Sequence, residues 1–262
     1  MRAYVDAMRC LLYLNSATLD MATHHPDETV RQEASERAEL LTPISKAWCT
    51  DVGVEMTSLG IQVHGGYGYI EETGAAQHFR DSRISPIYEG TNGIQAMDLV
   101  GRKLPMREGG VMGDLLIEMA AIDSDLAAAG EDFVTIRSGL ADARSAMEEA
   151  TSWLMAHGLA DPNDALAGST PYLRMFGQLA GGWLLARLAL GARRRLDAGE
   201  GVGVHIPCPV FHISKGVSGR LVEAWLAAAD SGRLASPVLC ALATMLAASA
   251  AAAWSPFDRA RR

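Results

Sequence analysis

A glutamate followed by a glycine, Glu89 and Gly90, is the pair in this sequence best suited to chemistry on a small substrate. A carboxylate can remove a weakly acidic proton when a desolvated site raises its pKa toward the working pH. Gly90 beside it leaves room for a bound substrate because glycine has no side chain. Taken alone, a Glu-Gly pair is more often a surface turn, so its interpretation depends on its neighbours.

The next three residues, Thr91, Asn92 and Gly93, are predicted to open a helix with Thr91 as its N-cap. The free backbone N–H groups at a helix start suit the polar edge or the phosphates of a bound cofactor. An ordinary N-cap uses the same residue types, and both interpretations can hold together. These three residues are therefore candidates for cofactor binding.

An earlier stretch, Gln62-Val63-His64-Gly65-Gly66, ends in two glycines. Glycine tolerates the left-handed conformation at a helix C-terminus, so a plain C-cap explains the glycine pair. Glycine turns are common, and the pattern by itself gives only weak support for a ligand.

Three charged residues precede the Glu89 loop: Arg80, Asp81 and Arg83. We expect their charges to pair and to fix the loop that presents Glu89. Farther along the chain, three potential metal ligands are separated by prolines: His205, Cys208 and His212. Three ligands in such a proline-interrupted segment make a poor metal site, so no metal is expected.

The elements that must position these residues are predicted to be helices. Apolar residues from Tyr4 to Leu19 recur on one helix face, so the chain begins inside a helix. A second helix begins near Asp27 and is interrupted at Thr42-Pro43. There threonine can cap the following helix and proline fits its first turn. The helix after it has an apolar stripe made of Ile44, Trp48, Val52, Leu59 and Val63.

A short helix is expected over residues 75–83, within a loop-rich region where functional residues concentrate. The helix capped by Thr91 would bury four residues: Ile94, Met97, Val100 and Leu104. A boundary between two parts of the chain is expected near residues 105–113. Beyond it, periodicity predicts helices around 116–126, 133–154 and 171–196. Gly181-Gly182 in the last one would permit close helix packing or a kink, and packing is the preferred interpretation.

Composition favours an all-α fold and excludes other classes. Alanine and leucine dominate, and aromatics make up only 6% of the residues, a mix that favours helices over strands. The net charge of −8 and the lack of a long basic block argue against nucleic-acid binding. The four cysteines form no C-x-x-C pair, which indicates reduced thiols and a cytoplasmic protein. We expect no export signal, and the uncharged run Pro237 to Trp254 is predicted to be a buried or surface helix.

Three linked motifs resemble the acyl-CoA dehydrogenase family in order and spacing. They are Gln62-Val63-His64-Gly65-Gly66-Tyr67-Gly68-Tyr69, Phe79-Arg80-Asp81-Ser82-Arg83-Ile84 and Ile87-Tyr88-Glu89-Gly90-Thr91-Asn92-Gly93-Ile94-Gln95. The likeness to the family's C-terminal helical-bundle domain covers about residues 1–104. Residues 113 to about 197 resemble the helical extension of the subgroup that includes 3-(methylthio)propanoyl-CoA dehydrogenases. We therefore expect a four-helix-type bundle over 1–104, then a second helical array over 113–262 that diverges after about residue 201.

The resemblance implies that Glu89 removes the α-proton of an acyl-CoA thioester while FAD accepts hydride from the β-carbon, which yields the 2,3-enoyl-CoA. It also implies that the backbone N–H of Glu89 polarises the thioester carbonyl and that Gly90 lies against the substrate. Thr91, Asn92 and Gly93 would contact FAD. Gln62 to Gly66 would contact the adenosine diphosphate part of FAD in a neighbouring subunit. A flavoprotein homo-oligomer that passes electrons to an electron-transfer flavoprotein is thus expected.

The family's N-terminal helical domain and middle β-domain have no counterpart in this sequence, which predicts a fragment, a separately encoded subunit or a truncated reading frame. Those domains line most of the acyl pocket, so the acyl chain is unspecified, although the subgroup suggests a short thioether acyl group. The alternative is a non-catalytic helical module that keeps the family's oligomerisation surface. A membrane tail over residues 237–254 ranks third.

Overall fold

The computed structural model describes residues 1–158, 160 and 162–199. Within these residues the chain forms helices and no strand, which confirms the all-α prediction. No helix in this part of the chain is long and apolar enough to cross a membrane. Several predicted features lie outside the described residues: His205, Cys208 and His212, the run Pro237–Trp254, and the divergence after about residue 201.

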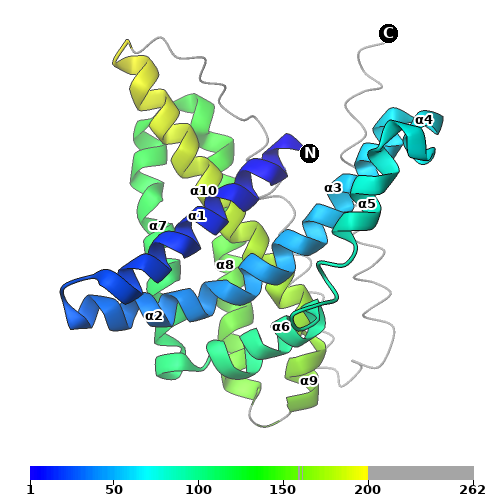
Figure 1. The fold of residues 1–262 in the computed structure, drawn as a ribbon. Coiled ribbons are helices and arrows are strands. Elements are labelled where there is room, and N and C mark those ends of the chain that lie inside the picture. Colours follow the sequence, from blue (N-terminus) through cyan, green and yellow to red (C-terminus); the bar gives the residue numbers. More distant parts are fainter. Residues whose placement is uncertain (159, 161, 200–262) are drawn as a thin grey trace.

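The first two helices, α1 (Arg2–His24) and α2 (Glu28–Pro43), pack against each other (Figure 1). Asp27 caps α2, because its Oδ1 accepts a hydrogen bond from the Thr29 amide at 2.8 Å. The second helix therefore begins where the sequence predicted.

The predicted interruption of the helix at Thr42-Pro43 is wrong. The helix continues through a π-helical turn, η1 (Ile44–Trp48), directly into α3 (Cys49–His64). Pro43 has no N–H to donate to the preceding turn, and the helix widens after it instead of breaking. The loop-bearing region is consequently attached to the end of one long, continuous helical segment.

The outer half of α3 forms an arm with α4 (Gly66–Tyr69), η2 (Glu71–Thr73) and α5 (Ala75–Ser82). α5 runs beside α3, and the arm projects away from the rest of the helices (Figure 1). The predicted apolar stripe is buried only at its start: Ile44, Trp48 and Val52 are buried, whereas the exposed fractions of Leu59 and Val63 are 45% and 75%. Val63, at the tip of the stripe, is largely uncovered by the described residues.

The remaining helices form the body of the molecule. α6 (Asn92–Asp98) runs into a second π turn, η3 (Leu99–Lys103), and η4 (Met106–Gly109) leads to the extension. The extension consists of α7 (Gly110–Ala128), η5 (Glu131–Phe133), α8 (Val134–His157), α9 (Pro162–Ala167) and α10 (Ser169–Asp197). Val100 and Leu104 are buried as predicted, but Ile94 and Met97 are largely exposed, since the π turn shifts the buried face along this helix.

One hydrophobic core spans both predicted domains, and α10 packs against α1, η1, α6 and α8. A methyl group built on Gly177 would lie 2.2 Å from Trp48 Cγ, and one on Gly181 would lie 2.9 Å from Trp48 Cη2. Gly177 and Gly181 are therefore both needed for the close approach of α10 to η1, as the packing interpretation of Gly181 proposed. The domain boundaries at 104 and 113 stay predictions.

Candidate functional site

Glu89 and Gly90 lie on the loop between α5 and α6, and both have left-handed backbone conformations with φ of +54° and +80°. Glycine adopts this conformation freely, whereas a residue with a Cβ pays about 1–2 kcal/mol. The Asn92 amide donates to the Pro86 carbonyl at 3.1 Å and closes the loop. The Glu89 side chain is exposed, so the described residues do not supply the desolvated surroundings expected for a general base.

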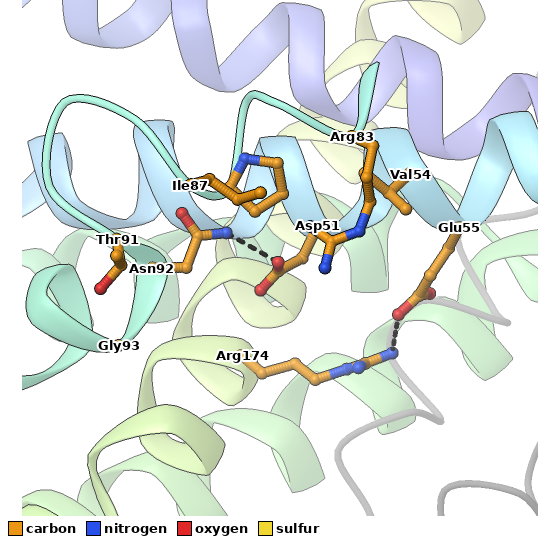
Figure 2. A pocket seen from close by; sticks show the side chains of 10 residues that line it. Asp51, Val54, Glu55, Arg83, Ile87, Thr91, Asn92, Gly93 and Arg174 are labelled. Atoms are coloured by element: carbon orange, nitrogen blue, oxygen red, sulfur yellow. Dashed lines mark hydrogen bonds and ion pairs between the residues drawn. The ribbon is translucent and has the colours of Figure 1, made fainter. Parts of the chain in front are cut away.

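The Asn92 side chain ties the end of this loop to the start of α3. Its Nδ2 donates to Asp51 Oδ1 at 2.7 Å (Figure 2), and its second hydrogen is within reach of Thr50 Oγ1 at 2.9 Å and of the Ala47 carbonyl at 3.1 Å. These contacts engage the whole side-chain amide in the protein. Any contact between Asn92 and a cofactor would therefore have to use its backbone.

Lys46, in the π turn η1, is the second tie between this loop and the long helix. Its ammonium donates to the Gly90 carbonyl and to Asn92 Oδ1, both at 2.7 Å. Partial desolvation lowers the pKa of Lys46, and the nearby carboxylates of Asp51 and Glu89 oppose that effect. Sequence reasoning missed this residue: Lys46, Thr50 and Asp51 share a helix face by their spacing, but nothing in the sequence indicates that Asn92 docks there.

The start of α6 has the predicted N-cap. Thr91 Oγ1 accepts a hydrogen bond from the Ile94 amide at 3.4 Å. The Gly93 amide has no acceptor among residues 1–158, 160 and 162–199. One backbone donor beside the capping threonine thus remains available to a ligand.

An open cleft of about 560 Å³ lies beside these residues. It is lined by Asp51, Val54, Glu55, Arg83, Pro86, Ile87, Thr91, Asn92, Gly93 and Arg174 (Figure 2). Arg174 reaches the cleft from α10 and pairs with Glu55 at 2.9 Å, so the extension contributes to the site. Glu89 is not among the lining residues, although the loop on both sides of it is.

The charged residues before the loop do not pair with one another as expected. Arg80 pairs with Glu71 at 3.4 Å, and Asp81 accepts from Gln77 Nε2 at 2.5 Å. Arg83 lines the cleft and has no ion pair in the described part of the chain. The Arg83 guanidinium is therefore a cationic group that faces the cleft.

The segment Gln62 to Gly66 lies at the far end of α3. Gly65 ends the helix with φ of +62°, which confirms the predicted glycine C-cap, and all five residues are exposed. The helix rise of 1.5 Å per residue puts this segment about 20 Å from Asp51. The two stretches assigned to FAD therefore do not meet within one chain.

No group of His, Cys, Asp and Glu side chains in the described residues is arranged to hold a metal ion. The chemical groups of the site are instead a carboxylate on a fixed loop, a helix start and a cleft with two arginines.

Comparison with known proteins connects this geometry to a family. The family model described as "Acyl-CoA dehydrogenase, C-terminal domain" matches residues 1–104. The model described as "Acetyl-CoA dehydrogenase C-terminal like" matches residues 116–204. The chain belongs to the acyl-CoA dehydrogenase family.

Curated proteins with similar sequences include two named as acyl-CoA dehydrogenases and one named as a subunit of a caffeyl-CoA reductase complex. The 3-methylmercaptopropionyl-CoA dehydrogenase of Ruegeria pomeroyi is 46% identical over 200 residues, which are 76% of this chain and 34% of the relative. A butyryl-CoA dehydrogenase of Syntrophomonas wolfei is 31% identical over 202 residues, 76% of this chain and 32% of that protein. The caffeyl-CoA reductase-Etf complex subunit CarC of Acetobacterium woodii is 29% identical over 104 residues, 40% of this chain and 24% of that subunit.

The chain thus spans about a third or less of the length of these acyl-CoA dehydrogenase relatives. The matched part holds the Glu89 loop and the cleft beside it, and the acyl-CoA dehydrogenase extension supplies Arg174.

Proposed function

We propose that this chain supplies the catalytic base and part of the FAD site of a dehydrogenase that converts an acyl-CoA thioester to its 2,3-enoyl-CoA. The observation that supports it most directly is the loop, where Glu89 is held in a left-handed conformation and tied to the start of α6. Strained backbone of this kind is concentrated at functional sites.

In this proposal the Glu89 carboxylate removes the α-proton, which is acidified weakly by the neighbouring thioester carbonyl. The Glu89 backbone N–H would polarise that carbonyl, and Gly90 would let the substrate approach the loop. FAD, when bound, supplies the hydride acceptor for the β-carbon. The exposed Glu89 side chain would be desolvated by the substrate and by parts of the enzyme beyond the described residues.

The described residues fit a bound FAD at two places. Beside the cleft, the free Gly93 amide, the Thr91 hydroxyl and the cationic Arg83 offer donors to an anionic, phosphate-bearing cofactor. At the tip of the arm, Gln62 to Gly66 is exposed and could reach FAD in a neighbouring subunit. A homo-oligomer is part of the proposal for that reason.

The substrate and the electron acceptor are proposed from the relatives' names. The Ruegeria relative is named for a thioether acyl-CoA, which agrees with a short thioether acyl group as substrate. The Acetobacterium relative is named as a subunit of an Etf complex, and we propose that electrons leave to an electron-transfer flavoprotein.

A chimaera tests the proposal most sharply. Residues 1–200 of this chain replace the matching segment of the Ruegeria protein, and dye reduction by 3-methylmercaptopropionyl-CoA is measured in the purified flavoprotein. We expect the chimaera to turn over and the Glu89→Gln form to lose about 10³-fold in kcat. The matched control is Glu108→Gln, since Glu108 is another glutamate with positive φ, at +58°, and lies outside the cleft.

Two results would count against the proposal. Turnover that survives Glu89→Gln at the parent rate would remove Glu89 from catalysis. A flavin-loaded, oligomeric chimaera with no turnover would favour the non-catalytic oligomerisation module. Flavin retained by the 262-residue chain after dialysis, and bleached by a short acyl-CoA, would show that the chain is active by itself.

A further inference from the structure

Lys46 makes the one side-chain hydrogen bond to the backbone of Glu89 or Gly90 among the described residues. The loop is strained there, because Glu89 carries a side chain at positive φ, and such a conformation persists only when surrounding contacts hold it. The bond from the Asn92 amide to the Pro86 carbonyl closes the loop behind Glu89. The contact from Lys46 fixes the strained pair itself.

The contacts of Lys46 use the chemistry that distinguishes lysine. An ammonium has three donors, and two of them reach the Gly90 carbonyl and Asn92 Oδ1 at 2.7 Å. Asn92 in turn donates to Asp51 at 2.7 Å, so the lysine, the amide and the carboxylate form one charge-balanced network. An apolar residue at position 46 would leave the Gly90 carbonyl without its side-chain donor, and Asn92 Oδ1 with only the longer contact from Thr50 Oγ1 at 3.3 Å.

The position of Lys46 is fixed from the other side by the extension. Lys46 lies in the π turn η1, and Trp48 of the same turn is fully buried between Gly177 and Gly181 of α10. π turns occur often at functional sites because they re-aim side chains along a helix. The ammonium is therefore presented to the loop by a rigidly packed element.

We propose that Lys46 is a positioning residue of the dehydrogenase site, which holds Glu89 and Gly90 in the left-handed conformation that presents the base. This assignment rests on the proposed role of Glu89. The conformational part of it can be measured without turnover.

Hydrogen exchange of the full 262-residue chain tests the conformational part. In Lys46→Met we expect the Asn92 amide and its loop neighbours to exchange about tenfold faster, while amides of α8 are unchanged. Lys46→Arg keeps the charge and the donors and should restore most of the protection. The matched control is Lys103→Met, because Lys103 is another half-buried lysine, paired with Glu39 at 2.6 Å, and does not touch the loop.

Unchanged loop exchange in Lys46→Met, within about twofold of wild type, would overturn the proposal. So would acceleration throughout the molecule that matches the Lys103→Met control, since that result means general destabilisation. These results do not depend on whether Glu89 is a base.

Kinetics of the flavin-loaded chimaera separate positioning from a purely structural role. We expect Lys46→Met to lower kcat about 100-fold at unchanged flavin content, and Lys46→Arg to recover most of that loss. A rise in KM alone, or equal losses in the methionine and arginine variants, would contradict positioning by the ammonium. If Glu89→Gln keeps full turnover while the exchange result holds, the proposed base is wrong and the loop contact stands.

Discussion

One stretch assigned to FAD, Gln62 to Gly66, lies at the tip of α3, and the other, Thr91 to Gly93, is bonded to its base, yet the two ends differ in how they are packed. At the base, residues 46–51 are packed under α10 and bonded to the start of α6. At the tip, Val63, Tyr67 and Tyr69 are 75%, 73% and 81% exposed. The base is organised by the chain itself, whereas the tip presents apolar and aromatic groups that no described residue covers.

This difference indicates that the two stretches assigned to FAD are organised in two ways, one by contacts within the chain and one by an exposed surface. Contacts within the chain fix the groups that must be precise, namely the loop of Glu89 and the helix start beside it. Exposed aromatic residues are typical of surfaces that are completed by another protein surface. Substitutions at the base should therefore affect the folding stability of the chain, and substitutions at the tip should affect only its association.

The largest effect is expected where α10 meets the base of α3. Gly177→Ala places a methyl group against the Trp48 ring and should lower the free energy of unfolding by about 3 kcal/mol. Gly191→Ala is the matched control on the same helix: nothing lies within 4 Å of its added methyl group, so it should be neutral or stabilising by up to about 1 kcal/mol. Urea unfolding followed by circular dichroism measures both. Equal midpoints would mean that α10 does not pack on Trp48 as described.

A smaller loss is expected from the polar network at the base. Asn92→Ala removes the partner of Lys46, Thr50 and Asp51, and should cost about 2 kcal/mol because these groups stay partly buried. Gln32→Ala removes an exposed amide, hydrogen-bonded to Glu36 at 2.9 Å, and should change stability by less than about 0.5 kcal/mol. If both variants have the same unfolding midpoint in urea, the network does not stabilise the N-terminal end of α3.

Sequence patterns predicted the base and the tip unequally well. The long apolar repeats gave α8 and α10 because their buried faces recur at helical spacing. The same rule placed Leu59 and Val63 in an apolar stripe but left their exposure open, since a periodic stripe does not reveal whether another element covers it. The break assigned to Thr42-Pro43 was wrong, because local propensity says nothing of the packing that keeps a proline inside a continuous helix.

Sequence motifs predicted only those residues of the candidate site that are consecutive in the chain. Glu89 to Gly93 and Gln62 to Gly66 could be singled out from their motifs, while the role of Glu89 comes from family resemblance. Lys46 and Arg174 could not be found this way. Lys46 is separated from Asn92 by 46 positions, and Arg174 reaches the cleft from the extension, so only the fold brings them to the site.

The pH dependence of stability gives a third test of how the N-terminal end of α3 is packed. Burial raises the pKa of Cys49, the first residue of α3, to about 12. The unfolded thiol ionises near about 8.5, so this stabilisation is present below that pH and is lost as pH rises toward the folded value. Between pH 7 and 10, wild type should lose up to about 2 kcal/mol more stability than Cys49→Ala, measured by urea unfolding. Parallel losses would show that the thiol is hydrated.

The smallest effect on stability is expected at the tip. Val63 and Tyr69 make so little intramolecular contact that Val63→Ser combined with Tyr69→Ser should keep the free energy of unfolding within about 0.5 kcal/mol of wild type. Sedimentation of the same variant should show weaker self-association, because the change removes exposed apolar surface from the arm. A stability loss as large as that of Asn92→Ala would mean that the tip is packed within the chain. Unchanged stability with weakened association would mean that the exposed residues at the tip of α3 contribute to contacts between chains and not to the folding of one chain.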